Sequence, residues 1–121
     1  MKFERTDRRD RKMEERDYTE LVEAFRKTWE LFPGQARLID RTNKVIAVNA
    51  FAAGNGRKPG EICAQLGAPE SHRGCRKMAA LDTGTGQLDR PFAERVRGWV
   101  PLKGYPDVVV HFSLAVPEVN K

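Results

Sequence analysis

Long hydrophobic stretches, a signal peptide and a cysteine framework are all missing from this sequence. Its apolar runs are only a few residues long, too short to span a bilayer. The N-terminal stretch MKFERTDRRDRKMEERDY is charged where a signal peptide would be apolar. Two cysteines are too few for a disulfide scaffold. We therefore expect a cytoplasmic protein with no membrane partner.

Clusters of like charge are missing too. The net charge is +5, but residues 1–20 carry seven basic and seven acidic side chains, so the excess is spread over the rest of the chain. Nucleic-acid sites normally need clustered cations or aromatic stacking platforms. The charge pattern therefore predicts a solvated surface and no nucleic-acid partner.

Catalytic motifs are the third absence. The sequence has no Gly-rich phosphate loop, no serine-nucleophile elbow and no HExxH pair. A cysteine nucleophile would need a positioned base and an oxyanion hole, and the sequence indicates neither. An enzyme of the small α+β cone or barrel type would need polar residues lining its cavity, and the predicted core face has few of them. We expect a protein that is not an enzyme.

The chain is expected to divide into a charged tail over residues 1–16, an amphipathic helix over 17–33 and a core domain over 34–121. The helix carries one apolar stripe at steps of three and four, made of Tyr18, Leu21, Val22, Phe25, Trp29 and Phe32. Pro33-Gly34 ends it. Such a stripe packs either on its own domain or on a dimer partner.

The sequence of the core predicts strands, then short helices, then strands. A hairpin is predicted from Ala36–Asp40 and Lys44–Asn49, with Asn43 in the left-handed conformation of the turn. A helix is predicted from Cys75 to a stop at Gly84, with Cys75, Met78, Ala79 and Leu81 near one face. Further strands are predicted at Arg95–Leu102 and Asp107–Val116, and another near Gln87–Glu94. This order indicates an α+β fold with helices segregated from one antiparallel sheet.

The stretch LIDRTNKVIAVNAFAAGNGRKPGEIC resembles the opening of a PAS sensor domain. The resemblance rests on a strand ending in Asp40, a second strand ending in Asn49, small residues after it, and a Gly and Pro-Gly-Glu segment at Gly56 and 59–61. Together with the later helix and strands it covers roughly residues 35–117. It implies a five-stranded antiparallel sheet with helices over one face. It also implies a regulatory role through a small ligand, redox change or partner protein, often in homodimers and without catalysis. The chain would act through a separate signalling partner or belong to a longer regulator.

A ligand pocket is predicted between one sheet face and the helices. The pocket candidates are Leu66, Met78, Leu81, Gly98, Val100, Val110, Phe112 and Leu114. Alternation places the strand residues on one face, and Gly98 would leave room for a ligand to approach. The alternative is a filled core without a cavity.

The opposite sheet face would expose Trp99 and Val109 unless another element covers it. The Tyr18–Phe32 stripe is the predicted cover, from the same chain or from a dimer partner. The interface candidates are Leu21, Val22, Phe25, Trp29, Trp99 and His111. We interpret His111 as a partly covered sheet residue and not as a ligand.

Cys63, His72 and Cys75 form the only cluster of soft ligands that the spacing suggests. Some PAS-like domains carry cysteines at similar places, so the resemblance implies a metal- or heme-binding redox sensor as an alternative. A closed zinc site takes four ligands and this segment offers three, and no CxxCH heme motif is present. We expect no metal or cofactor, with Cys63 and Cys75 as buried apolar residues. Redox chemistry of the thiols stays open, because Cys75 precedes a helix.

Overall fold

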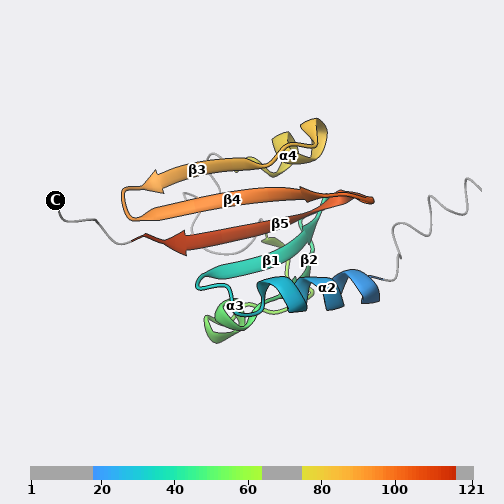
Figure 1. The fold of residues 1–121 in the computed structure, drawn as a ribbon, viewed down its shortest axis with the longest axis horizontal. Helices are drawn as coiled ribbons and strands as arrows, with labels where there is room; N and C mark the ends of the chain where they lie inside the picture. Colours follow the sequence, from blue (N-terminus) through green and yellow to red (C-terminus); the bar gives the residue numbers. More distant parts are fainter. Residues whose placement is uncertain (1–17, 64–74, 117–121) are drawn as a thin grey trace, which may run out of the picture.

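A computed structural model describes residues 18–63 and 75–116 of the 121-residue chain. Its elements are α2 (Thr19–Trp29), β1 (Gln35–Asp40), β2 (Val45–Val48), α3 (Ala50–Gly54), α4 (Lys77–Thr83), β3 (Gln87–Phe92), β4 (Arg95–Leu102) and β5 (Tyr105–Ala115). The strands form one antiparallel sheet in the order β2-β1-β5-β4-β3 (Figure 1). The predicted α+β fold with a five-stranded antiparallel sheet is therefore confirmed. The charged tail predicted over 1–16 lies outside the described residues.

Helix α2 covers one face of the sheet, which we call the α2 face. Leu21 and Phe25 point from the helix into this core. The strands contribute small and branched apolar side chains, namely Ala36, Leu38, Ala47, Val108 and Val110. Near the end of the helix, Trp29 stacks on Phe112 with ring centroids 5.8 Å apart, and Phe32 meets the same ring edge-on at 5.5 Å. Burial of this apolar surface is the main force that holds α2 on the sheet.

Helix α4 packs on the opposite face, which we call the α4 face. Ala80 is fully buried there against Trp99 and Val109, and Leu81 is partly buried beside them. Ile39 and Val45 complete this smaller core. The α4 helix thus covers the end of the sheet at which the β1–β2 hairpin turns.

Helices α2 and α4 each cover the sheet face that the sequence prediction assigned to the other. The α2 stripe was expected over Trp99 but packs on Val108 and Val110, and α4 lies on the Trp99 face. The cause is the Val108-Val109-Val110 run, which makes both faces of β5 apolar. Alternation alone therefore does not decide which helix covers which face.

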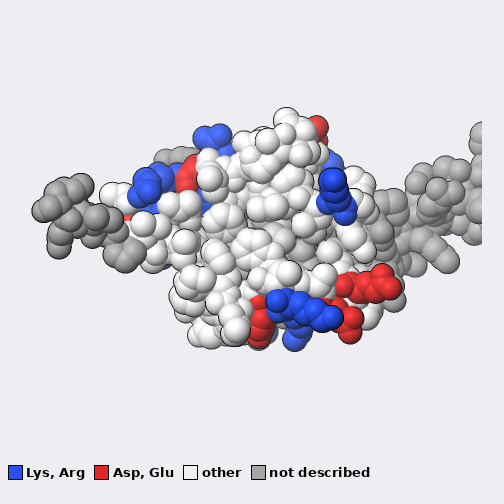
Figure 2. Space-filling model, in the orientation of Figure 1, with Lys and Arg blue, Asp and Glu red and all other residues white. Residues whose placement is uncertain are grey.

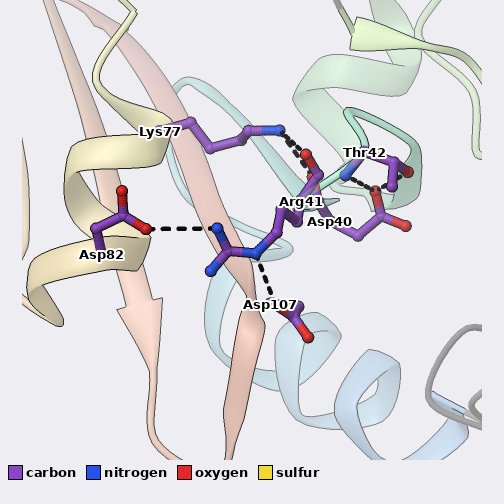
Figure 3. Close-up of polar contacts among 6 residues, drawn as sticks. All are labelled: Asp40, Arg41, Thr42, Lys77, Asp82 and Asp107. Carbon is purple, nitrogen blue, oxygen red and sulfur yellow. Dashed lines mark hydrogen bonds and ion pairs between the residues drawn. The ribbon is translucent and has the colours of Figure 1, made fainter. Parts of the chain in front are cut away.

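The buried face of α4 also differs from the prediction. Met78 is 44% exposed and Ala79 is exposed, whereas Lys77 and Ala80 are buried. Lys77 turns inward because its ammonium finds three acceptors. Two are the main-chain carbonyls of Asp40 and Arg41, each at 2.9 Å (Figure 3). The third is Asn43 Oδ1. Three acceptors match the three protons of an ammonium group, which offsets the loss of hydration.

Candidate functional site

One row of side chains crosses the α4 face from edge to edge. The registers align Gln87 with Trp99, Trp99 with His111, His111 with Arg37, and Arg37 with Val48. Directly opposed residues of antiparallel strands project from the same side of a sheet. The row therefore places a large aromatic ring, an imidazole and a guanidinium side by side across β4, β5 and β1.

His111 is held as a neutral ring at the centre of this row. It stacks almost parallel on Trp99, with centroids 4.8 Å apart and an 8° angle between the planes. Its Nδ1 lies 2.9 Å from the Gly98 carbonyl oxygen, so Nδ1 carries the proton and donates it. Burial above all, helped by the charges of Arg37 and Arg97, lowers the pKa of His111 to about 4 despite the hydrogen bond to Gly98. At neutral pH the ring is uncharged.

Arg97 belongs to the next row and is fully paired. Its Nε and Nη2 donate to the two carboxylate oxygens of Asp89 at 3.0 and 2.6 Å, a bidentate pair in which both side chains are largely buried. The guanidinium also lies 5.2 Å from the ring centroid of Trp99. On the same face, Arg95 donates to Ser113 Oγ at 2.7 Å. These contacts account for Arg97 as a structural residue.

Arg37 contrasts with Arg97. Its Nη1 lies 3.8 Å from Cys63 Sγ, and its Nε is buried without a hydrogen-bond partner among the described residues. No carboxylate of the described residues forms an ion pair with it. A guanidinium takes carboxylate or phosphate groups in a two-point contact. Sequence reasoning missed Arg37, although a charged residue inside the apolar strand ARLID is the signal that could have found it.

The predicted pocket residues are divided between the two faces of the sheet. Val100, Val110 and Phe112 belong to the α2-face core, while Leu81 packs on the α4 face. Leu114 is partly buried and pairs with Val96, Met78 is largely exposed, and Leu66 lies outside the described residues. A Cβ atom at Gly98 would collide with the ring of Phe112. The space above Gly98 is thus filled by Phe112, which corrects the prediction that Gly98 leaves room for a ligand.

The predicted interface residues are likewise split. Leu21, Val22, Phe25 and Trp29 pack within their own chain on the α2 face. Trp99 and His111 are buried on the α4 face, 1% and 9% exposed. The stripe therefore does not cover Trp99.

The alternative metal ligands are only partly described. Cys63 is a half-buried free thiol and Cys75 an exposed one, and His72 lies outside the described residues. Cys75 is therefore not the buried apolar residue that the sequence suggested. Within residues 18–63 and 75–116, no three His, Cys, Asp or Glu side chains are grouped so that they could hold a metal ion.

The two polar residues of the resemblance, Asp40 and Asn49, organise the chain locally. Asp40 Oδ1 accepts from the amide and the hydroxyl of Thr42 (Figure 3). It also accepts from the amide of Lys44, which closes the hairpin turn. Asn49 is fully buried. Its amide donates to the Trp29 and Gly34 carbonyls, and its Oδ1 accepts from the amides of Ala36 and Ala52. Asn49 thus joins the end of α2, the start of β1 and the start of α3.

Among the described residues, no helix is long and apolar enough to cross a membrane. Comparison of the chain with protein-family models, with curated proteins and with solved structures finds no match.

Proposed function

We propose that this protein is a PAS-like regulatory module without catalytic activity, and that it senses a small organic anion at Arg37 on the α4 face. The observation that carries this proposal is the contrast between two arginines of one sheet face. Arg97 has its own buried carboxylate, whereas the buried Nε of Arg37 has no partner among the described residues. Leaving a buried polar group unpaired is unfavourable. A ligand that supplies the missing acceptor would remove that penalty.

The surroundings of Arg37 suit an anion more than a cation. Among its described strand residues the α4 face carries Arg37, Arg95 and Arg97 against two carboxylates, Asp89 and Asp107, and Asp107 is paired with Arg41. His111 adds no opposing charge because it is neutral at physiological pH. A carboxylate or phosphate group that reached Arg37 would meet a net positive field in a partly buried site, where charge interactions are stronger than in water.

The architecture agrees with the regulatory part of the proposal. The antiparallel five-stranded sheet is what the PAS resemblance implies, and Asp40 and Asn49 have well-defined structural roles in it. Helices cover both faces of this sheet, whereas the resemblance implies one covered face. The site offers Arg37 as a binding group, and its described residues include no nucleophile positioned beside a base. A separate signalling partner would read the bound state.

Self-association is the second part of the proposed role, and it needs another surface than the α2 stripe. Leu88 lies in a row with Gly98, Phe112 and Ala36, hence on the α2 face, and is 64% exposed. In Figure 2 the charged side chains gather over α2 and toward the ends of the sheet, and the area between them is uncharged. We place the homodimer surface on this β3–β4 part of the α2 face. Sedimentation of Leu88→Glu beside the unchanged protein tests this: equal masses at all concentrations would refute it.

The anion proposal is tested with acetate, benzoate and inorganic phosphate as probes. Melting curves of the full chain should shift upward with increasing concentration of at least one probe, because binding to the folded state stabilises it. Arg37→Met should abolish the shift. Arg95→Gln, which removes a like charge from the same face, should keep it. A shift that survives Arg37→Met, or no shift with any probe, would contradict the proposal.

A further inference from the structure

The segments that carry Cys63 and Cys75 both contact the turn of the β1–β2 hairpin. The amide of Cys63 donates to the Asn43 carbonyl at 2.6 Å, and its neighbour Ile62 forms a bridge with Lys44. Lys77, two residues after Cys75, donates to Asn43 Oδ1 and to two main-chain carbonyls of the same turn. The side chain and the main chain of Asn43 thus hold the two cysteine-bearing segments beside each other.

The two thiols also share a charged environment. Burial lowers the pKa of Lys77, and the charges of Cys75, Asp40 and Cys63 act on it in the opposite direction, that of Cys75 most strongly. Both cysteines therefore act electrostatically on the same ammonium group. Cys63 has a second cation beside it, since Arg37 Nη1 donates to its Sγ. Negative charge that develops on the Cys63 sulfur during a reaction is therefore stabilised by Arg37.

We propose that Cys63 and Cys75 are a redox modification site that closes into an intramolecular disulfide when it meets a peroxide. Cys75 is the entry point because it is exposed, whereas Cys63 is half-buried. The Cys75 thiolate attacks one oxygen of hydrogen peroxide and the O–O bond breaks, which gives a sulfenic acid and, after protonation, water. The Cys63 thiolate then attacks the Cys75 sulfur, the S–O bond breaks and a second water leaves. Two thiols are oxidised by two electrons and one peroxide is reduced to two waters.

The disulfide would join the end of the Ile62 bridge to the start of α4. Both anchor points are already fixed on the hairpin turn, by the Cys63 amide and by the Lys77 ammonium. Closing the chain between residues 63 and 75 restricts the unfolded state, so the oxidised form should be the more stable one. This inference does not depend on the anion at Arg37, and either can fail without the other.

Intact mass spectrometry of the full chain tests the proposal. The dilute protein is treated with hydrogen peroxide, and remaining thiols are then alkylated with N-ethylmaleimide. The monomer should lose two hydrogens, take up no maleimide and yield one cross-linked peptide containing residues 63 and 75. Dithiothreitol should restore two alkylation sites, and the oxidised form should melt at a higher temperature. Persistence of both alkylation sites after peroxide treatment would refute the proposal.

Two serine variants separate the roles of the thiols. In Cys63→Ser the sulfenic acid at Cys75 should persist and be trapped by dimedone, because no second thiol resolves it. In Cys75→Ser the remaining half-buried Cys63 should react with peroxide more slowly than Cys75 does. Equal dimedone labelling of Cys75 in the unchanged protein and in Cys63→Ser would overturn the pairing, as would disulfides that form only between molecules.

Discussion

The two faces of this sheet are built from different chemistry. The α2 face is closed by aliphatic and aromatic side chains from α2, β1 and β5, with Leu38 and Val108 almost fully buried. The α4 face mixes apolar residues with a neutral histidine and a bidentate Arg97–Asp89 pair, and the Nε of Arg37 there has no hydrogen-bond partner among the described residues. Apolar burial is the larger source of folding free energy. The difference indicates that the α2 face supplies most of the apolar burial, whereas the α4 face, where we propose the anion site, carries the buried polar side chains.

A single strand produces this difference. In β5, the Val108-Val109-Val110 run supplies both faces, and from His111 onward polar and apolar residues alternate, with Phe112 on the α2 face and Ser113 on the other. Two helices then cover a sheet whose central strand is apolar on both sides at one end only. The polar half of the α4 face follows directly from this alternation.

The largest effect is expected from the α2 face. Phe25 is 3% exposed in the core beneath α2. Phe25→Ala should lower the free energy of unfolding by about 3–5 kcal/mol, because it removes buried surface and leaves a cavity. Leu31→Ala is the matched control, since Leu31 is 91% exposed, and its effect should stay within about 0.5 kcal/mol. Urea denaturation measures both. Equal effects would mean that α2 does not pack as described.

The second prediction concerns the pH dependence that the α4 face adds. The unfolded chain binds a proton at His111 below about pH 6.5, whereas the folded chain does so only near pH 4. Stability from the neutral ring is therefore fully present above pH 6.5 and is lost as pH falls toward 4, in total roughly 3 kcal/mol.

Denaturation at several pH values checks this prediction. In His111→Phe the slope between pH 6.5 and 4 should become flatter. His72→Gln, which changes the other histidine, should leave the slope unchanged. The burial of His111 would be refuted if both variants kept the original slope.

The third prediction concerns the close packing of the α2 face at Gly98. A methyl group there would collide with the Phe112 ring, which itself packs on Trp29 and Phe32. Gly98→Ala should destabilise the fold by about 1–3 kcal/mol through overpacking. Gly86→Ala is the control, because its added carbon would meet only the Trp99 carbonyl oxygen at 3.8 Å. Thermal melts compare the two. If Gly98→Ala left the melting temperature unchanged, the packing of Phe112 against Gly98 would be refuted and open space at this position would be supported.

The smallest stability effect is expected at Arg37. Arg37→Met should change the free energy of unfolding by less than about 1 kcal/mol, because the lost N–H···S contact is offset by removal of a buried unpaired Nε. Arg97→Met should be clearly more damaging, since it leaves Asp89 buried without its cation. Parallel urea denaturation of the two variants measures the difference. A reversed order would assign Arg37 to the structure and Arg97 to binding.

Local features of the fold were accessible from the sequence. The turn of the first hairpin was predicted at Asn43, which has φ 75°, and the end of the later helix at Gly84, which has φ 66°. Strand β4 has the predicted bounds, and β1, β2 and β5 differ from theirs by one or two residues. These features depend on neighbouring residues and on alternation, which a sequence displays directly.

Features that depend on tertiary contacts could not be predicted from the sequence in the same way. The exchange of the two helical covers could not be foreseen, because Val108-Val109-Val110 offers both faces an apolar surface. The inward turn of Lys77 depends on carbonyls of residues far away in the chain. The contrast between Arg37 and Arg97 appears only when the strand registers show which arginine lies beside Asp89. The charge inside ARLID could point to Arg37 in the sequence, but its lack of a carboxylate partner among the described residues could not be read there.

The most direct test of the difference between the two faces uses the two tryptophans, one on each face. Trp29 packs with Phe112 on the α2 face, and Trp99 stacks on His111, the row neighbour of Arg37, on the α4 face. The indole N–H signals of the ¹⁵N-labelled full chain are followed by NMR while benzoate or inorganic phosphate is added. The account predicts a saturable shift of the Trp99 signal, absent in Arg37→Met, with the Trp29 signal unmoved. A saturable shift of Trp29 alone, or a Trp99 shift that persists in Arg37→Met, would contradict it.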